Sequence, residues 1–174
     1  MKTVFLLRHA KSDWDDPTLK DHDRSLSERG RAAAPKIGAY IKSKRYKPET
    51  ILCSTARRTV ETYDLIKGAI GEGSKVKFEE SLYLAELRHL LERLKWLDDE
   101  LKSAMIIGHN PGMEQLANAL PHAPKTEAEE KLHKRMREKF STCAFAVIKL
   151  PVKAWRDVKP GIGTLADFVR PRDL

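Results

Sequence analysis

Arginine and histidine side chains follow three separate apolar runs in this sequence. Arg8 and His9 come directly after the first run, Arg58 lies shortly after the second, and His109 lies shortly after the third. Guanidinium groups match phosphate oxygens bidentately, and the free N–H groups at the start of a following helix add partial positive charge. If these side chains converge, they form a site for a phosphate dianion.

Histidine can also act as the nucleophile in such a site, because a neutral imidazole accepts a phosphoryl group on a ring nitrogen. Neighbouring cations favour the neutral form of the ring. His9 lies beside Arg8 at the end of a predicted strand, where a sheet holds the reacting atom in line. We therefore interpret His9 as the candidate nucleophile and His109 as a second, electrostatic histidine.

The three apolar runs indicate the strands that position these residues. Residues 3–7, 50–53 and 104–107 are largely apolar without alternation, which is typical of parallel strands buried on both faces. In open parallel sheets, ligands bind at the carboxyl ends of the strands. We expect the three strand ends to meet in one crevice although they lie far apart in the sequence.

Segments with helical character alternate with the predicted strands. Ser25 and Glu28 have the spacing of a capping box, which predicts a helix over 25–44 that Pro35 either kinks or enters in its first turn. The other predicted helices cover 55–69, 84–97 and 111–120, and a further strand at or near a sheet edge covers 143–150. This alternation predicts an α/β domain with a largely parallel central sheet.

The composition indicates one globular domain, spanning residues 1–174, with an excess of positive charge. Thirty-three basic and 25 acidic side chains give a formal charge of +8, which is compatible with nucleic acid, acidic lipid or phosphorylated partners. No apolar run near the start approaches the ~20 residues of a membrane span or the ~7–15 of a signal-peptide core. We expect a cytoplasmic protein.

The two cysteines and the remaining histidines lack the spacing of a metal site. Cys53 and Cys143 fit neither a zinc motif nor a paired framework, and we interpret them as buried thiols in a reducing compartment. The sequence therefore predicts neither a metal nor a cofactor. The other histidines that show no metal spacing are His22, His89, His122 and His133.

Four ordered blocks of sequence carry a resemblance to a known family. They read LLRHAKS at 6–12, DRSLSERG at 23–30, STARRTVET at 54–62 and IGHNPG at 107–112, and the closing TLADFVRP at 164–171 also fits. The chain resembles the histidine phosphatase superfamily, also called phosphoglycerate mutase-like, and within it the SixA-like phosphohistidine phosphatases. The resemblance implies a three-layer α/β sandwich whose central, mostly parallel sheet is flanked by helices.

The resemblance also implies roles for individual residues. By motif position, His9 is the histidine that becomes phosphorylated, while Arg8, Arg58 and His109 hold the phosphoryl group. The two remaining predicted neighbours of the phosphate are Ser12 and Asn110.

The choice between two adjacent arginines follows from the same pattern. The family places its arginine four residues after the motif serine, and counting from Ser54 gives Arg58. Arg57 is therefore assigned to solvent or to a peripheral contact.

The sequence departs from the family pattern at two points. Ala10 follows the motif histidine where glycine is usual, a change that SixA-like members tolerate. The mutase branch supplies a glutamate as general acid, and here Glu86 is the nearest candidate, although its surroundings match poorly. A phosphoramidate needs a strong protein acid less than a phosphate ester does. The weak match therefore favours phosphohistidine over sugar phosphates.

The leading hypothesis is a metal-independent phosphatase that acts through a phosphohistidine intermediate, with phosphohistidine in proteins as its substrate. One alternative is a small-molecule phosphomonoesterase or mutase-like enzyme of the same superfamily. Another is a non-catalytic phosphate-recognising domain. A cysteine-dependent phosphatase built on Cys53 fails on spacing, because that chemistry needs five residues between cysteine and arginine and position 59 is threonine.

The expected partners are a phosphorylated protein or a small phosphorylated compound. The mixed charges of residues 125–139 favour a solvated helix over a docking surface. Trp14, Trp96 and Trp155 are scattered and form no stacking platform between basic residues, so the sequence predicts no nucleic-acid binding. Membrane binding is not predicted either.

Overall fold

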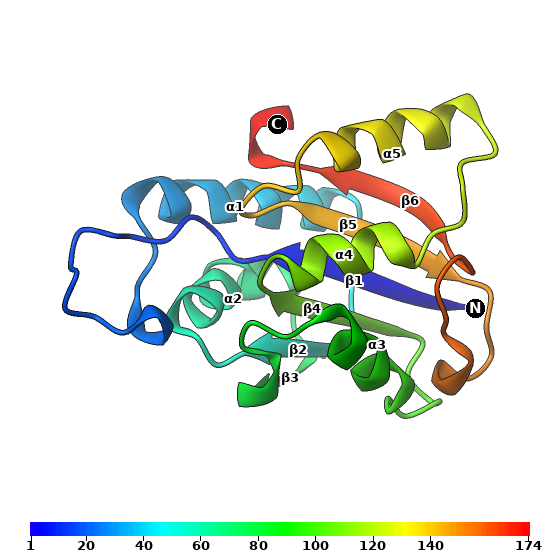
Figure 1. The fold of residues 1–174 in the computed structure, drawn as a ribbon, viewed down its shortest axis with the longest axis horizontal. Coiled ribbons are helices and arrows are strands. Elements are labelled where there is room, and N and C mark those ends of the chain that lie inside the picture. The colour runs from blue at the N-terminus through cyan, green and yellow to red at the C-terminus, as the bar shows by residue number, and fades with distance from the viewer.

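The computed structural model describes all 174 residues and is built on one six-stranded sheet (Figure 1). The strand order is β3-β2-β4-β1-β5-β6. The first four strands in this order run parallel to one another, whereas β5 is antiparallel to both β1 and β6. The strands are β1 (Lys2–Arg8), β2 (Thr50–Ser54), β3 (Lys75–Glu79), β4 (Ser103–Gly108), β5 (Phe145–Leu150) and β6 (Thr164–Val169).

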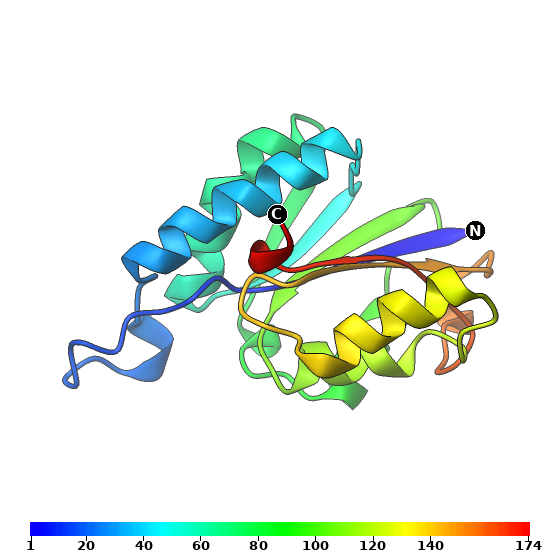
Figure 2. The same cartoon turned by 90° about the horizontal axis from the view of Figure 1, so that it is seen from above.

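Helices cover both faces of the sheet, as Figure 2 shows from above. The pair α1 (Glu28–Ser43) and α2 (Arg57–Ile70) lies on one face. The other face carries α3 (Leu87–Lys95), α4 (Gly112–Ala119) and α5 (Glu127–Glu138). This arrangement confirms the predicted three-layer α/β fold. None of the helices is both long enough and apolar enough to cross a membrane.

The apolar runs of the central strands are explained by burial on both sides. In β1, Val4 and Leu6 belong to the core beneath α3 and α4, while Phe5 and Leu7 belong to the core beneath α1 and α2. Successive strand residues point to opposite faces, so a strand covered twice must be apolar throughout. Each fully buried Val or Leu contributes about 1.5–3 kcal/mol relative to an exposed one.

The start of α1 differs from the prediction. Ser27, rather than Ser25, is the N-cap, and its side chain accepts a hydrogen bond from the N–H of Gly30 at 3.1 Å. Ser25 instead belongs to the segment that pairs with the chain after β1, since its carbonyl accepts from the N–H of Asp13 at 2.8 Å. Pro35 lies inside the helix, well after Glu28, so it does not mark the first turn. Its side chain is exposed.

The remaining elements refine the predicted order. The helix expected over 84–97 begins only at Leu87, because Leu84 has a φ of +49° and is half-exposed. The strand expected over 143–150 is β5, which lies one strand in from the edge, beside β6. The strands β3 and β6 were not predicted, since both mix charged and apolar residues.

Candidate active site

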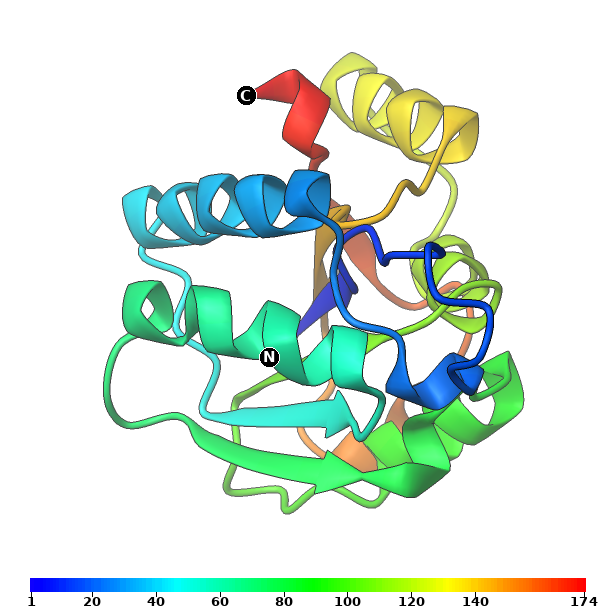
Figure 3. The ribbon, with the colours of Figure 1, turned by 90° about the vertical axis from the view of Figure 1, so that its left-hand side faces the viewer.

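A cleft opens at the carboxyl end of β1, the side of the molecule that faces the viewer in Figure 3. Its volume is about 670 Å³. No carboxylate side chain lines it, whereas two histidines, His9 and His109, do. The lining cations are Arg8, Lys11, Arg24, Arg29, Arg58, Lys139 and Arg172.

The sheet and two helix starts bring the predicted residues together. Arg8 ends β1 and His9 follows it, with the His9 N–H bonded to the Gly108 carbonyl of β4 at 3.1 Å. His109 directly follows β4, and Arg58 lies in the first turn of α2. The sequence-based expectation that these four side chains share one crevice agrees with this geometry.

The hydrogen bond at Nδ1 of His9 decides which ring nitrogen is unprotonated. Nδ1 lies 2.7 Å from the Ala10 carbonyl, which can only accept, so Nδ1 carries the proton and Nε2 carries the lone pair. Burial, reinforced by the charges of Arg58 and Arg8, lowers the pKa of His9 to about 3. The ring is therefore neutral at physiological pH, as a nucleophile must be.

His109 is the second neutral imidazole of the cleft. Its Nε2 lies 2.8 Å from the Ser54 hydroxyl, which itself accepts from the Ala56 N–H, so the hydroxyl hydrogen is free to donate to Nε2. Nδ1 is buried without a partner. Burial and the neighbouring His9 and Arg58 lower the pKa of His109 to about 3. The two histidine rings are 5.2 Å apart between centroids.

Arg58 is fixed between His9 and an aspartate. Its Nε donates to Nε2 of His9 at 3.4 Å, and its terminal nitrogens donate to the Asp21 carbonyl at 2.8 Å and to the Asp21 carboxylate at 3.0 Å. The guanidinium is almost fully buried. Asp21 was not singled out from the sequence, because it precedes the motif block at 23–30 and only the fold brings it to α2.

The Asp21 carboxylate accepts hydrogen bonds from three side chains. Arg24 donates to it at 2.9 and 3.1 Å, Arg58 donates to the other oxygen, and the Tyr83 hydroxyl donates there as well. Burial opposes ionisation of Asp21, but these hydrogen bonds outweigh it and hold its pKa below the ordinary value. Asp21 is therefore an anion that orients two arginines, not a proton donor.

Arg24 extends the network to the predicted residue Ser12. Its Nη1 donates to Ser12 Oγ at 2.7 Å, and its guanidinium carbon lies 3.3 Å from the centroid of the Trp14 ring. Both Ser12 and Trp14 line the cleft, although Trp14 is largely exposed. Arg24 lay within a motif block, yet the sequence alone offered no signal for its role.

Arg8 retains free donors. One terminal nitrogen, Nη1, donates to the Phe140 carbonyl at 3.2 Å, while its buried Nε has no hydrogen-bond partner. Asn110 also lines the cleft, but its amide nitrogen donates to the same Phe140 carbonyl at 3.1 Å and its oxygen accepts from the Glu114 N–H. Asn110 therefore shapes the wall beside Arg8 with its own polar atoms already occupied.

Glu86 does not join the other predicted residues. It is exposed at the N-cap of α3 and does not line the cleft. The segment before it packs against the start of α4, where a Cβ on Gly112 would lie 2.0 Å from the Ala85 carbonyl oxygen. This close packing leaves Leu84, rather than Glu86, in the cleft wall.

Arg57 and the cysteines lie outside the site chemistry. Arg57 is exposed and donates to Glu61 at 3.0 Å, as the peripheral assignment predicted. Burial raises the pKa of the Cys53 and Cys143 thiols to about 12, so neither is a thiolate. The site brings together no group of three or more carboxylate, thiol or imidazole ligands, and independence of metal ions stays a prediction.

Comparison with protein families gives one match over most of the chain. The family described as "Histidine phosphatase superfamily (branch 1)" matches residues 4–144. Among curated proteins, Rv1276c of Mycobacterium tuberculosis is 32% identical over 166 residues, covering 95% of this chain and 100% of that protein. The chloroplastic protein At3g52155 of Arabidopsis thaliana is 32% identical over 184 residues, covering 98% of this chain and 78% of that protein.

Solved structures with the same fold include two SixA proteins. A proposed phosphohistidine phosphatase SixA from Agrobacterium tumefaciens has a TM-score of 0.80 and 31% sequence identity, with 98% of each chain covered. A protein histidine phosphatase SixA complexed with tungstate has a TM-score of 0.77 and 20% identity over 98% of each chain, which supports the fold alone.

Proposed function

Because this chain belongs to the histidine phosphatase superfamily, we propose that it is a metal-independent phosphohistidine phosphatase that acts on proteins through a phosphohistidine intermediate at His9. The observation that carries the proposal is the unprotonated Nε2 of His9, whose lone pair meets only the Nε–H of Arg58, at 3.4 Å. It belongs to a ring that is neutral and buried in a cleft lined by arginines and by no carboxylate.

In the first step, the Nε2 lone pair of His9 attacks phosphorus on the side opposite the leaving nitrogen. A new N–P bond forms while the substrate P–N bond breaks, and the departing imidazole takes a proton from water. Arg8 and Arg58 bind the oxygens of the transferring group, where fixed donors act strongest on the charge of the transition state. His109, whose ring centroid lies 5.2 Å from that of His9, is assigned to bind a further phosphoryl oxygen.

In the second step, water attacks the phosphorus of phosphorylated His9. The water gives up a proton to solvent, where it neutralises the hydroxide left by the first step, while the N–P bond to His9 breaks and its electron pair returns to Nε2. Inorganic phosphate leaves, and the neutral ring is restored. The hydrogen bond from Nδ1 to Ala10 holds the ring through both steps.

The groups around the leaving atom support a phosphoramidate substrate. Asp21 is ionised by its three donors, and Glu86 lies outside the cleft lining. The cleft lining therefore contains no carboxylic acid that could protonate an alkoxide leaving group. An imidazole leaving group depends on such an acid less, because its P–N bond is labile. The similarity to the proposed phosphohistidine phosphatase from Agrobacterium tumefaciens supports the same substrate class.

A substrate panel tests this proposal. We expect the purified protein to hydrolyse a phosphohistidine peptide with a kcat/KM about a hundredfold above that for a sugar phosphate, the low end of what a general acid contributes. An aryl phosphate, whose leaving group needs little protonation, should fall between them. A preference for sugar phosphates would contradict the proposal and favour the small-molecule alternative. Binding of phosphate without turnover of any substrate would favour a non-catalytic domain.

A further inference from the structure

The cleft holds more positive charge than the transfer to His9 uses. Arg8 and Arg58 lie beside the nucleophile, and Arg24 is bound to Asp21 and Ser12. Arg172 lies 3.9 Å from Glu138. Three further cations, here called the outer cations, line the same cleft: Lys11, Arg29 and Lys139.

The outer cations have no carboxylate partner in the chain. All three are exposed, and none has an Asp or Glu oxygen within 4.0 Å. A neighbouring shallow hollow, bordered by Lys11 and Arg29, also contains Asp13, Asp15 and Glu28, but these acids do not line the cleft itself. The charge on the cleft side is therefore uncompensated.

Three segments, far apart in the sequence, hold the outer cations around the cleft. Lys11 follows β1, and its carbonyl accepts from the N–H and hydroxyl of Ser27 at 2.9 and 3.1 Å. This contact brings the start of α1 so close that a Cβ on Gly30 would lie 2.1 Å from the Lys11 carbonyl oxygen, which places Arg29 beside Lys11. Lys139 is the C-cap of α5, next to the Phe140 carbonyl that binds Arg8.

The helix dipole favours Lys139 at the C-terminus of α5 but does not account for Arg29. Arg29 lies in the first turn of α1, where the helix dipole disfavours a cation. Like charges around one cleft also repel each other. An anion from outside the chain offsets the dipole penalty at Arg29 and the repulsion among all three outer cations.

We propose that the outer cations bind carboxylate side chains that flank the phosphorylated histidine in a polypeptide substrate. This inference rests on the proposed function and adds a substrate class to it. Only three of the 17 residues lining the cleft are apolar, and its cations come from separate segments. Such a wide polar cleft fits an extended acidic chain better than a compact ligand with a single second phosphate.

A pair of chemically phosphorylated histidine peptides tests the inference. One peptide carries Asp and Glu on both sides of the phosphohistidine, and the other carries Ser and Gly. We expect a kcat/KM about tenfold higher for the acidic peptide at low ionic strength, since several exposed ion pairs each contribute modestly. The ratio should fall as salt is added, because exposed charges are screened.

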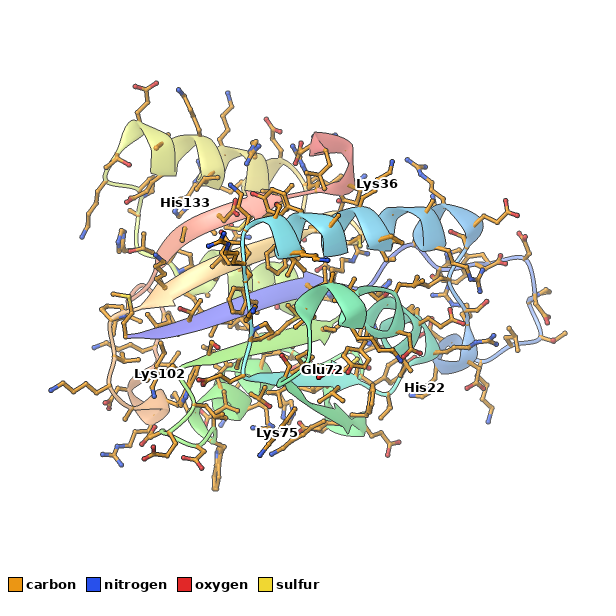
Figure 4. The ribbon with its side chains drawn as sticks, turned by 180° about the vertical axis from the view of Figure 1, so that it is seen from behind. His22, Lys36, Glu72, Lys75, Lys102 and His133 are labelled. Carbon is orange, nitrogen blue, oxygen red and sulfur yellow. The ribbon has the colours of Figure 1, made fainter.

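A charge variant assigns the preference to the outer cations. In K11Q/R29Q/K139Q the ratio of the two kcat/KM values should fall to about one. The control K36Q/K75Q/K102Q removes the same charge from exposed lysines that do not line the cleft and are labelled in Figure 4, and it should keep the ratio.

The outcomes separate the inference from the function on which it rests. Equal kcat/KM values for both peptides with the unaltered protein, or a preference that survives K11Q/R29Q/K139Q, would overturn the inference and leave the phosphatase proposal intact. If K11Q/R29Q/K139Q lowered kcat/KM for a sugar bisphosphate but not for the acidic peptide, the choice of a polypeptide substrate would be overturned. Hydrolysis of neither peptide would overturn the proposed function and this inference with it.

Discussion

Arg58 contacts His9 and Asp21 with different nitrogens of one guanidinium group. Its Nε lies 3.4 Å from Nε2 of His9, and its Nη2 lies 3.0 Å from the Asp21 carboxylate. The aspartate thus fixes the arginine that faces the nucleophile. Because Asp21 also binds Arg24, one carboxylate orients two of the cations in the cleft.

Replacing Asp21 tests this positioning role. In D21N the loss of negative charge should loosen Arg58 and lower kcat by about tenfold or more, since a displacement of about 1 Å at a catalytic group can cost a hundredfold. The matched control is D23N, which changes an exposed carboxylate in the same turn. Steady-state kinetics on a phosphohistidine peptide give kcat and KM separately. Equal kcat values for D21N and the unaltered protein would show that Asp21 does not position Arg58.

Two adjacent arginines provide a second matched pair. Arg58 is buried beside His9, whereas Arg57 is exposed and binds Glu61. In R58A, kcat should fall by about 10²–10³, the usual loss for one transition-state donor. R57A should stay within about twofold, because an exposed pair contributes little. The reverse order of the two kcat values would mean that the motif alignment is off by one residue.

The pKa of about 3 for His9 and His109 predicts how stability depends on pH. In the unfolded chain both rings titrate near the ordinary value of 6.5. Between these pKa values the unfolded state binds more protons, so the free energy of unfolding falls as pH falls from about 6.5 towards 3. Each histidine contributes at most about 1.4 kcal/mol per pH unit.

Urea unfolding at pH 7 and pH 5 measures this dependence. H109Q should weaken it, because the buried ring no longer contributes, while replacement of the exposed His89 in H89Q should not. If H109Q showed the same loss of unfolding free energy between the two pH values as the unaltered protein, His109 would not be held neutral by the fold.

Much of the fold could be predicted because burial leaves a strong sequence pattern. The residues of β1, β2 and β4 are apolar on both faces, so their order and the crevice at their ends follow from the chain. The edge strands β3 and β6 were not predicted because charged residues interrupt their apolar pattern, as at the exposed Lys75 and the half-buried Asp167. The true cap of α1, Ser27, was missed because Ser25 has the same chemistry two residues earlier.

The candidate site, like the fold, was predicted only in part from the sequence. Arg8, His9, Arg58 and His109 lie at strand and helix ends, where spacing indicates convergence. Asp21 and the outer cations occupy loops or exposed turns, and their roles can be inferred only from their neighbours in the folded structure. Glu86 was chosen for its place in the sequence, and the packing of Ala85 against Gly112 keeps it outside the cleft lining.

Trapping the phosphorylated protein shows whether His9 carries the phosphoryl group during turnover. The protein is mixed with a ³²P-labelled phosphohistidine peptide, quenched within milliseconds, and mapped by mass spectrometry under alkaline conditions. We expect an acid-labile, base-stable phosphoryl group on His9 that decays at the rate of turnover and is absent from H9A, which should have no activity. Turnover without label on His9, or activity retained in H9A, would contradict this expectation.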